Sequence, residues 1–457
     1  MKSPLADLIY RRLFTAQVIA LAGTGLSTIA LALLAYDLAG GGAGVVLGTA
    51  LALKMIAYVG IAPIVGAFAH QLPRRALLIG LDVARALTVI CIPFVTEIWQ
   101  IYVLIFVLNA CSAGFTPTFQ ATIPDILQDD ARYTRALSLS RLAYDLENLL
   151  SPLFAAAALI VLSYDALFAI NATTFLISAC LVFSVRLPSP QPPERDVSVW
   201  NNLTFGIRAY LATPRLRGLL ALSFAVAATG AMVIVNTVVY VRAHLSGSET
   251  ETALAFTAFG AGSMIVALAL PRFLDRLPDR PFMLVGSMIL TTGLLLGLFE
   301  PGLLALLMIW IILGAGTSLI QTPSGRLLKR SAGVSDRPAI YAAQFALSHG
   351  CWLIAYPLAG WVGGTFGLTV AFLILGLVSI VSTIAAVILW PTNDKVELDH
   401  VHRPTHHDHL HFHDEHHQHT HEGWEGDEPH RHSHAHYAMK HTHAYVIDLH
   451  HPEWPSD

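Results

Sequence analysis

The stretch GAFAHQLPRR (66–75) and the stretch FLDRLPDR (273–280) mark the same point in two halves of this sequence. Each is a basic turn that contains a proline, and each lies between two long apolar runs. A second similarity has the same offset of about 205 residues, because SPLFAA (151–156) corresponds to YPLAGW (356–361). An internal repeat of this kind predicts two related halves with a binding site near the plane between them.

The composition is that of a membrane protein. Of the 457 residues, 54% are hydrophobic and 13% are charged, and the mean hydropathy is +0.59. Soluble domains carry about 25% charged residues, so a soluble globular protein is excluded. Runs of about 20 apolar residues, each long enough to cross a bilayer as a helix, recur from Leu13 to Trp390. The first run lacks a small-residue cleavage site, and many more follow it, so we expect it to remain as a span.

We predict twelve spans in two groups of six, separated by the polar, proline-rich stretch PSPQPPERDVSVWNN (188–202). The predicted spans are 13–37, 45–69, 76–96, 99–122, 137–162, 165–186, 216–241, 252–273, 282–299, 302–322, 339–366 and 368–390. The expected fold is an all-α membrane protein with twelve transmembrane helices in two six-helix halves and a disordered tail. The expected domains are an N-terminal half (1–187), a cytoplasmic central loop (188–215), a C-terminal half (216–390) and a tail (391–457).

The placement of basic residues predicts the orientation. Lys and Arg gather in the connections after even-numbered spans and in the middle loop, whereas the opposite side has little beyond Arg242. The positive-inside rule therefore places both termini and the tail in the cytoplasm.

The basic turns resemble the loop of the major facilitator superfamily, Gly-x-x-x-Asp-Arg-x-Gly-Arg-Arg. The corresponding positions are Gly66, His70, Arg74 and Arg75 in the first copy and Asp275, Arg276 and Arg280 in the second. The first copy departs from the family at its acid and first arginine, and the second lacks the leading glycine. The resemblance covers residues 1 to about 390 and implies a latch that sets the balance between inward-facing and outward-facing states. With His70 in place of the acid, a weaker or pH-sensitive latch is predicted.

The tail is rich in histidine, most densely in HHDHLHFHDEHHQHTH (406–421). From Pro391 to Asp457 there are 19 histidines, 13 acidic and 4 basic residues, so the segment cannot bury enough apolar surface to fold when free. Neutral imidazole suits nickel, cobalt, zinc and copper(II), and alternating histidines can converge on one ion. The predicted metal-binding residues are His406, His407, His409, His411, His413, His416, His417, His419, His421, His430, His432, His434 and His436. An inert tail, a pH sensor and an expression tag are the alternatives.

A metal-binding tail on a twelve-span facilitator resembles the nickel-resistance permeases of the NreB type. That resemblance implies proton-driven export of nickel, and sometimes cobalt, across a bacterial inner membrane.

Ionisable residues inside apolar helices are costly enough to indicate function. The fifth predicted span contains SRLAYDLENLLSP (140–152), in which Arg141, Asp145 and Asn148 share one helical stripe and Glu147 lies on another. One interpretation is an Arg141–Asp145 ion pair that braces the helix. The other makes Asp145 or Glu147 the group that alternates between a proton and a metal ion.

Two further candidates lie near mid-membrane. His349 in the eleventh predicted span corresponds to Tyr144 by the repeat and is expected to face the acids of the fifth span. Lys54 in the second span is a candidate counter-ion for Asp145 or Glu147, or a proton-coupling group. Asp82 and Arg85 are expected to brace the latch loop.

The leading hypothesis is a monomeric secondary exporter of divalent metal, nickel before cobalt, driven by protons. Its expected partners are metal ions, protons and the lipid bilayer, with no nucleic acid and no required cofactor. The second hypothesis is an exporter of an organic compound, a siderophore or a metal chelate, and the third is a membrane-anchored metal sensor or store. An enzyme is not expected, because the sequence has no nucleotide-binding loop and no ordered hydrolytic framework.

Overall fold

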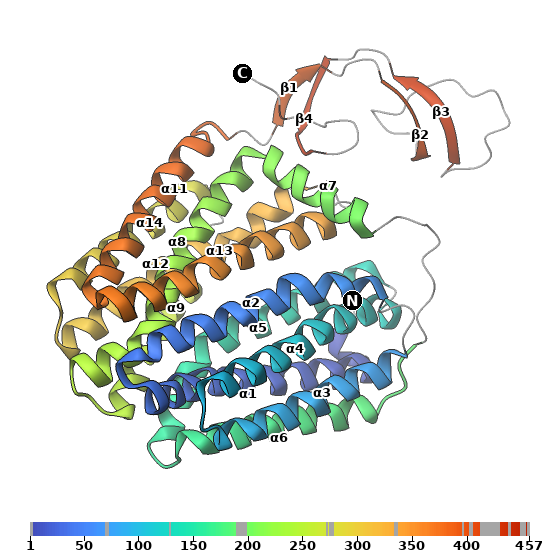
Figure 1. The fold of residues 1–457 in the computed structure, drawn as a ribbon. Coiled ribbons are helices and arrows are strands. Elements are labelled where there is room, and N and C mark those ends of the chain that lie inside the picture. The colour runs from blue at the N-terminus through green and yellow to red at the C-terminus, as the bar shows by residue number, and fades with distance from the viewer. Residues whose placement is uncertain are drawn as a thin grey trace.

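The computed structural model describes residues 3–68, 73–127, 129–188, 199–270, 273, 278–332, 337–394, 397–401, 405–411, 430–436, 440–447 and 454. These residues form a helical bundle with four short strands at one end (Figure 1). The predicted all-α membrane fold is confirmed for the bundle.

Twelve long helices occur among the described residues, one for each predicted span. They are α1 (Leu8–Ala39), α2 (Ala43–Phe68), α3 (Arg74–Cys91), α4 (Ile98–Ile126), α5 (Asp130–Leu159), α6 (Tyr164–Phe183), α8 (Pro214–Val239), α9 (Glu249–Ala269), α11 (Asp279–Leu296), α12 (Leu303–Arg330), α13 (Arg337–Phe366) and α14 (Leu368–Leu389). Helices suit this setting because they satisfy their backbone hydrogen bonds internally, whereas lipid offers no hydrogen-bonding partners. We call the end of the bundle where α1 begins and α14 ends the terminal face.

The helices differ in how apolar they are. Nine described stretches are long and apolar enough to cross a membrane, and one of them, Leu8–Ile61, contains both α1 and most of α2. The described residues of α5 and α13 include no such stretch, and both helices carry polar residues along their length. These two helices also meet the opposite half, since α5 packs on α9 and α13 packs on α2. The polar helices therefore lie where the two halves join.

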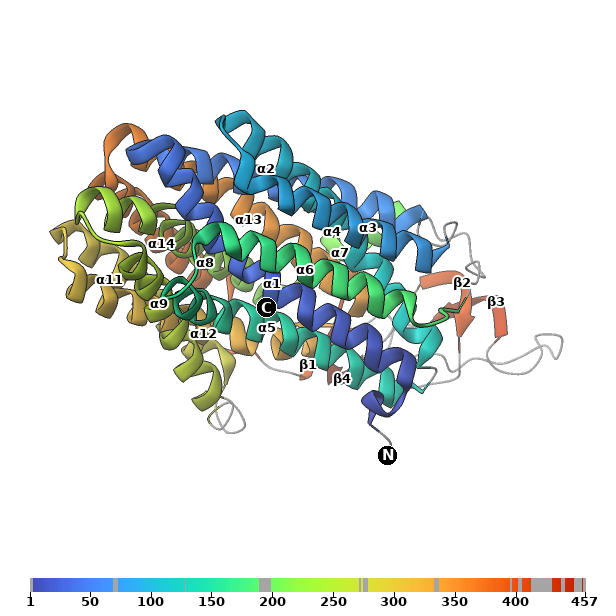
Figure 2. The ribbon, with the colours of Figure 1, turned by 90° about the horizontal axis from the view of Figure 1, so that it is seen from below.

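The contact between α2 and α13 is tightest at the face opposite to the termini. A Cβ atom on Gly48 would lie 2.6 Å from the carbonyl oxygen of Tyr356, and one on Gly360 would lie 2.3 Å from that of Gly44. Nearer the terminal face, the same helices leave Phe345 41% exposed and Tyr341 43% exposed. Two views of the bundle show α2 and α13 running alongside one another (Figures 1 and 2). The close approach of Gly44, Gly48 and Gly360 therefore closes this junction at the face opposite to the termini.

The central loop contains a helix that the sequence analysis did not predict. The helix α7 (Val199–Ala212) lies on α13, and its Gly206 is so close that a Cβ there would meet the Ala339 carbonyl oxygen at 2.4 Å. Its Tyr210 hydroxyl donates a hydrogen bond to Gln344. The sequence analysis missed α7 because its apolar residues begin only after the proline-rich stretch.

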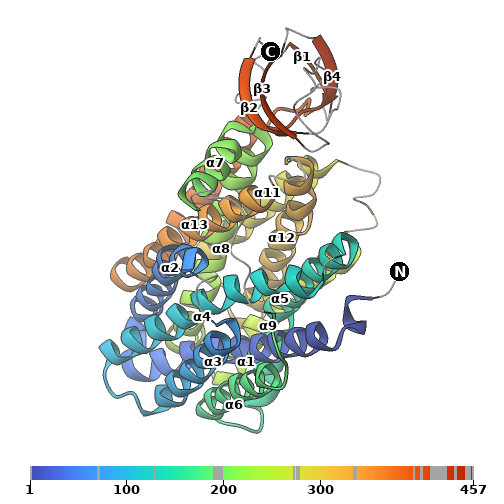
Figure 3. The same cartoon turned by 90° about the vertical axis from the view of Figure 1, so that its right-hand side faces the viewer.

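The tail holds four short strands where the sequence predicts no fixed structure. They are β1 (Glu397–Val401), β2 (Thr405–His411), β3 (His430–His436) and β4 (Lys440–Ala444). The strand β1 pairs with β4, and β2 pairs with β3, both antiparallel. Figure 3 shows the strands beyond α7. An isolated two-stranded ladder is at best marginally stable in water, so this pairing is compatible with a tail that is disordered when free.

Replacing Gly48 with alanine tests the close contact between α2 and α13. The added methyl group meets the Tyr356 carbonyl, so we expect the free energy of unfolding to fall by about 1–3 kcal/mol. Gly60→Ala on the same helix is the control, because a Cβ there meets nothing within 4 Å and alanine favours a helix by about 0.5–1 kcal/mol. Thermal unfolding in detergent compares the two, and equal midpoints would contradict the close packing.

Candidate functional site in the membrane and at the terminal face

Three of the predicted intramembrane residues come together from three helices and both halves. Lys54 lies on α2, Glu147 on α5 and His349 on α13. The Lys54 ammonium is within electrostatic range of the Glu147 carboxylate and of the His349 imidazole. Whether Lys54 is the counter-ion of Glu147 or of Asp145 stays a prediction, because the Asp145 side chain lies outside the described part of the chain.

The His349 ring is held by its neighbours. Its Nδ1 lies 2.7 Å from the Phe345 carbonyl oxygen, and its centroid lies 3.9 Å from the Phe345 ring and 5.8 Å from the Tyr58 ring. A carbonyl can only accept a hydrogen bond, so Nδ1 carries the proton in the neutral ring. That tautomer leaves the Nε2 lone pair available to accept a proton or to bind a metal ion.

Glu147 occupies space that a glycine provides. A Cβ on Gly25 of α1 would lie 3.0 Å from Glu147 Oε1 and 1.8 Å from Ser151 Oγ, so only glycine allows α5 this close. Arg141, Asp145 and Asn148 also lie on α5, but their side chains are outside the described part of the chain. The Arg141–Asp145 ion pair and the role of Asp145 therefore stay predictions.

Asp82 and Arg85 form a buried ion pair within the N-terminal half. Ser178 of α6 donates a 2.7 Å hydrogen bond to Asp82, and the Arg85 guanidinium lies 4.2 Å from the Phe115 ring and 4.4 Å from the Phe175 ring. These contacts join α3 to α4 and α6. The pair therefore fastens three helices of one half, and its expected role of bracing the latch loop stays a prediction.

The terminal ends of the two halves hold equivalent ion pairs of opposite polarity. In the N-terminal half, Arg74 at the start of α3 pairs with Asp125 near the end of α4. In the C-terminal half, the equivalent positions are Asp279 and Arg330, whose charged atoms are 3.9 Å apart. Asp279 also accepts a 2.9 Å hydrogen bond from Arg326. In both halves an ion pair thus joins the third long helix to the fourth, with the acidic and basic positions exchanged.

The next arginine in each turn caps the last helix of its half. Arg75 donates to the Phe183 carbonyl at the end of α6, and Arg280 donates to the Trp390 carbonyl at 2.9 Å after α14. The last carbonyls of a helix lack partners within the helix and favour a nearby cation, so both arginines stabilise these ends. Gly66 lies in the last turn of α2, whereas His70, Asp275 and Arg276 lie outside the described residues.

The charge network of the C-terminal half continues into the tail. Asp394 pairs with Arg330 and with Arg215 of α8, the second at 3.0 Å, and accepts a 3.0 Å hydrogen bond from Trp390 Nε1. Arg215 is fully buried and also donates to Ser331 Oγ at 2.9 Å.

Arg215 binds the far end of the tail as well. Its Nη2 donates to the Tyr445 carbonyl at 3.2 Å, and its guanidinium lies 5.0 Å from the Trp454 ring, which packs on Tyr445. Ile447 is buried beside them. The chain therefore leaves the bundle at Asp394 and returns to the same arginine at Tyr445. We call Arg215, Tyr445 and Trp454 the tail anchor.

The predicted metal ligands of the tail are only partly described. The positions of His406, His407, His409, His411, His430, His432, His434 and His436 lie in β2 and β3, whereas His413, His416, His417, His419 and His421 lie outside the described residues. Among the side chains that are described, no group of three His, Cys, Asp or Glu residues is placed to hold a metal ion. Metal binding by the tail therefore stays a prediction.

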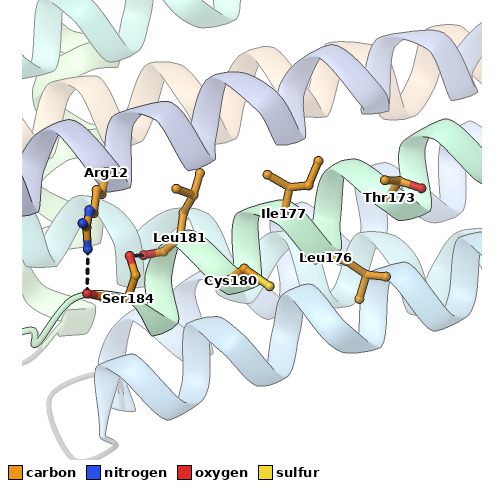
Figure 4. Close-up of a pocket in the computed structure, with 7 residues that line it drawn as sticks. All are labelled: Arg12, Thr173, Leu176, Ile177, Cys180, Leu181 and Ser184. Carbon is orange, nitrogen blue, oxygen red and sulfur yellow. Dashed lines mark hydrogen bonds between the residues drawn. The ribbon is translucent and has the colours of Figure 1, made fainter.

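A shallow pocket lies on α6. Figure 4 shows its lining by Thr173, Leu176, Ile177, Cys180, Leu181 and Ser184 of α6 and by Arg12 of α1. The Arg12 guanidinium donates to the Ser184 carbonyl at 2.8 Å. Leu176 and Ile177 are exposed, and in a membrane protein such side chains face lipid, so the pocket is a lipid-facing groove.

The sequence analysis missed Asp125, Arg215, Asp394 and Tyr58. The repeat offered a signal for Asp125, because the equivalent position in the other half holds the basic residue Arg330. The sequence held no comparable signal for Arg215 or Asp394, because each lies at the edge of a predicted domain.

Comparison with known proteins gives a family match along both halves. The model of the Major Facilitator Superfamily matches residues 13–235 and 219–411. An uncharacterized MFS-type transporter of Bacillus subtilis, YfiS, is 23% identical over 69% of this chain and 77% of its own length. Macrolide efflux protein A of Streptococcus pyogenes is 25% identical over 32% of this chain and 37% of its own.

Solved structures share the fold. The nucleoside transporter NupG has a TM-score of 0.64 at 14% identity and covers 83% of this chain and 98% of its own. A bacterial homolog of the human lysosomal transporter Spinster, in an inward-facing and occupied conformation, has a TM-score of 0.66 at 12% identity and covers 85% of this chain and 97% of its own. At these identities the likeness shows the fold alone.

The reversed ion pairs predict a charge-swap rescue. Arg74→Asp places two carboxylates together and should lower the free energy of unfolding by about 1–3 kcal/mol. Adding Asp125→Arg should recover most of the loss, because the C-terminal half uses that polarity. Thermal unfolding of the two variants beside Asp125→Arg alone measures the coupling, and a double variant no more stable than the worse single one would refute the pairing.

The tail anchor predicts that one tryptophan protects the tail. Trp454→Ala removes the ring that packs on Arg215 and Tyr445, so limited trypsin digestion should cut the tail several-fold faster. Trp424→Ala is the control, since it removes the same side chain from elsewhere in the tail. Equal digestion rates for the two variants would show that Trp454 does not hold the tail.

Proposed function

This chain belongs to the Major Facilitator Superfamily, and from that premise we propose that it exports divalent metal ions, nickel before cobalt, in exchange for protons. The observation that carries the proposal is the histidine-rich segment, which leaves α14 and returns to Arg215 at the foot of α8. Imidazoles are suitable ligands for these ions. Because the segment is tied to the bundle at both ends, ions bound to it stay at a high effective concentration beside the transporter.

The proposed orientation puts the terminal face in the cytoplasm of a bacterium, with both termini and the tail there. Arg74, Arg75, Arg280, Arg326 and Arg330 all lie at that face, as the positive-inside rule requires. The junction of α2 and α13 is closely packed at the opposite face, so in this proposal ions load from the cytoplasmic side of the inner membrane. The transporter works as a monomer, because its site lies between its own two halves.

The proposed exchange takes place at Lys54, Glu147 and His349. Without metal, the Lys54 ammonium of α2 balances the charge of the Glu147 carboxylate of α5. An entering metal cation takes the carboxylate oxygens and the free His349 Nε2 and displaces Lys54. A proton arriving from outside then neutralises Glu147 and releases the ion. A buried carboxylate binds either a proton or a metal ion, which couples the two movements.

A second function has specific support. The relatives named macrolide efflux protein A indicate that organic compounds are exported by similar chains, and the described side chains include no ready-made group of three metal ligands. In that case the substrate is an organic compound, a siderophore or a metal chelate, and the tail buffers or senses metal.

Metal uptake into inside-out vesicles under an imposed proton gradient tests the proposal. We expect uptake of nickel, and less of cobalt, by the full chain, and its loss on Glu147→Gln because that amide cannot exchange protons. Truncation after residue 396 should lower uptake only modestly. The cut must spare Asp394, since removing it would strip the buried Arg215 of its partner.

Glu251→Gln is the matched control, because this half-buried residue caps the first turn of α9 through Ser248. Absence of gradient-driven metal uptake, together with metal-independent efflux of an organic compound, would establish the second function. Equal loss of uptake from Glu147→Gln and from truncation, at matched protein levels, would refute the division between transport site and tail.

A further inference from the structure

The groove on α6 runs from the terminal face toward the middle of the membrane. Its lining follows the helix from Ser184 back to Thr173, a length of about 16 Å at 1.5 Å per residue. Figure 4 shows Arg12 and Ser184 at one end of this row of side chains and Thr173 at the other. The hydrocarbon core of a bilayer is about 30 Å thick, so one leaflet is about 15 Å deep. The groove is therefore about as long as one leaflet is deep.

Between its two ends the groove is apolar and open. Leu176 is 49% exposed and Ile177 is 42% exposed, and Cys180 is also exposed. Together with Leu181 they recur at intervals of three and four residues, so they share one face of α6. The groove has a volume of about 450 Å³. Its middle is therefore suited to an extended hydrocarbon chain.

The terminal end of the groove is cationic. The half-buried Arg12 of α1 donates to the Ser184 carbonyl at 2.8 Å, and Arg75 of α3 donates to the Phe183 carbonyl. The Arg75 guanidinium also lies 4.7 Å from the Phe183 ring. A guanidinium has five N–H donors, so its bond to Ser184 leaves Arg12 with donors for a further acceptor. Two arginines from two other helices thus hold the end of α6.

The charges beside this end are mostly positive. Arg11 precedes Arg12 on α1, Arg186 follows Ser184 by two residues, and both are exposed. The acid in the same part of the chain is Asp7, whose carboxylate accepts hydrogen bonds from two backbone amides in the first turn of α1. That carboxylate is therefore committed to capping the helix. The end of the groove has an excess of positive charge that an anion can balance.

From this arrangement we propose that the groove on α6 binds an anionic phospholipid, with the phosphate at Arg12 and one acyl chain along Leu181, Ile177 and Leu176. Guanidinium and phosphate complement each other in charge and in hydrogen-bonding geometry. Basic pockets between transmembrane helices at the membrane surface bind anionic headgroups in this way. A soluble phosphate would use only the cationic end, whereas a lipid uses the exposed apolar face as well.

The site is separate from the proposed transport site. It lies on the outer surface of the N-terminal half and uses none of Lys54, Glu147 and His349. Lipid binding is measured without any transport, so the inference stands or fails independently of metal export. A lipid held by Arg12 and α6 joins the terminal ends of α1 and α6.

A second groove in the same half provides an internal control. It lies at the turn between α3 and α4, on the face opposite to the termini, and its lining includes Cys91 and Gln100 among apolar side chains. No charged residue lines it. Cys91 is exposed, as Cys180 is, so each groove contains one accessible thiol. The two thiols therefore report on a charged and an uncharged groove in one molecule.

Thiol labelling of the full chain in detergent tests the site. N-ethylmaleimide is added with phosphatidylglycerol or with phosphatidylcholine of the same acyl chains, and peptide mass spectrometry follows the labelling rate of each cysteine. We expect phosphatidylglycerol to slow the labelling of Cys180 several-fold more than phosphatidylcholine does, and the two lipids to affect Cys91 equally. Equal protection of Cys180 by both lipids would overturn the selectivity for an anion. Equal protection by inorganic phosphate would overturn the role of the acyl chain.

Substitution of Arg12 tests the cation. In Arg12→Gln the phosphatidylglycerol concentration that gives half-protection of Cys180 should rise about fivefold, and Arg12→Lys should lie between this variant and the unmodified chain. Arg208→Gln is the matched control, because Arg208 is an exposed arginine of α7 that likewise donates to a backbone carbonyl. Equal shifts in Arg12→Gln and Arg208→Gln would overturn the site, since loss of net charge would explain both. The comparison of Cys180 with Cys91 needs no variant, so it decides the matter even where Arg12→Gln fails to fold.

Discussion

A bilayer interior offers no hydrogen-bonding partner to a polar side chain, and the arrangement of this protein follows from that constraint. Two helices with polar residues along their length, α5 and α13, pack on helices of the opposite half, where other protein groups replace water. Glu147 of α5 and His349 of α13 each interact there with Lys54 of α2. The glycines that let α1 approach α5 and α2 approach α13 keep that junction narrow.

The two halves repeat one design at their terminal ends. A carboxylate and an arginine close the junction between the third and fourth helices of each half, and a second arginine caps the sixth. Because the ion pair has opposite polarity in the two halves, an equivalent contact is kept while the local charge pattern differs. The C-terminal copy extends to a further acid, Asp394, and through it to Arg215 and the tail.

Most of the fold was predictable, because hydropathy and the repeat depend on the sequence alone. The twelve spans and the superfamily followed from those signals, and Glu147, His349 and Lys54 were proposed from their cost in lipid. The helix α7 was missed because the prolines before it dominated the local signal. Arg215 and Asp394 were missed because their partners lie far away in the chain, and no local pattern records such contacts. The strand register of the tail was equally hidden, since alternation fixes a face but not which residues oppose one another.

The tail anchor ties an acidic chain to a basic body. Residues 391–457 carry 13 acidic and 4 basic side chains, whereas the preceding residues carry 18 acidic and 23 basic ones. If the proposed function holds, each divalent ion bound by neutral histidines adds two positive charges to the tail and lowers its net negative charge. Attraction to the arginines at the terminal ends of α8 and α12 then falls as metal binds. Under that proposal, the metal load of the segment is expressed as a change in charge where the chain rejoins the bundle.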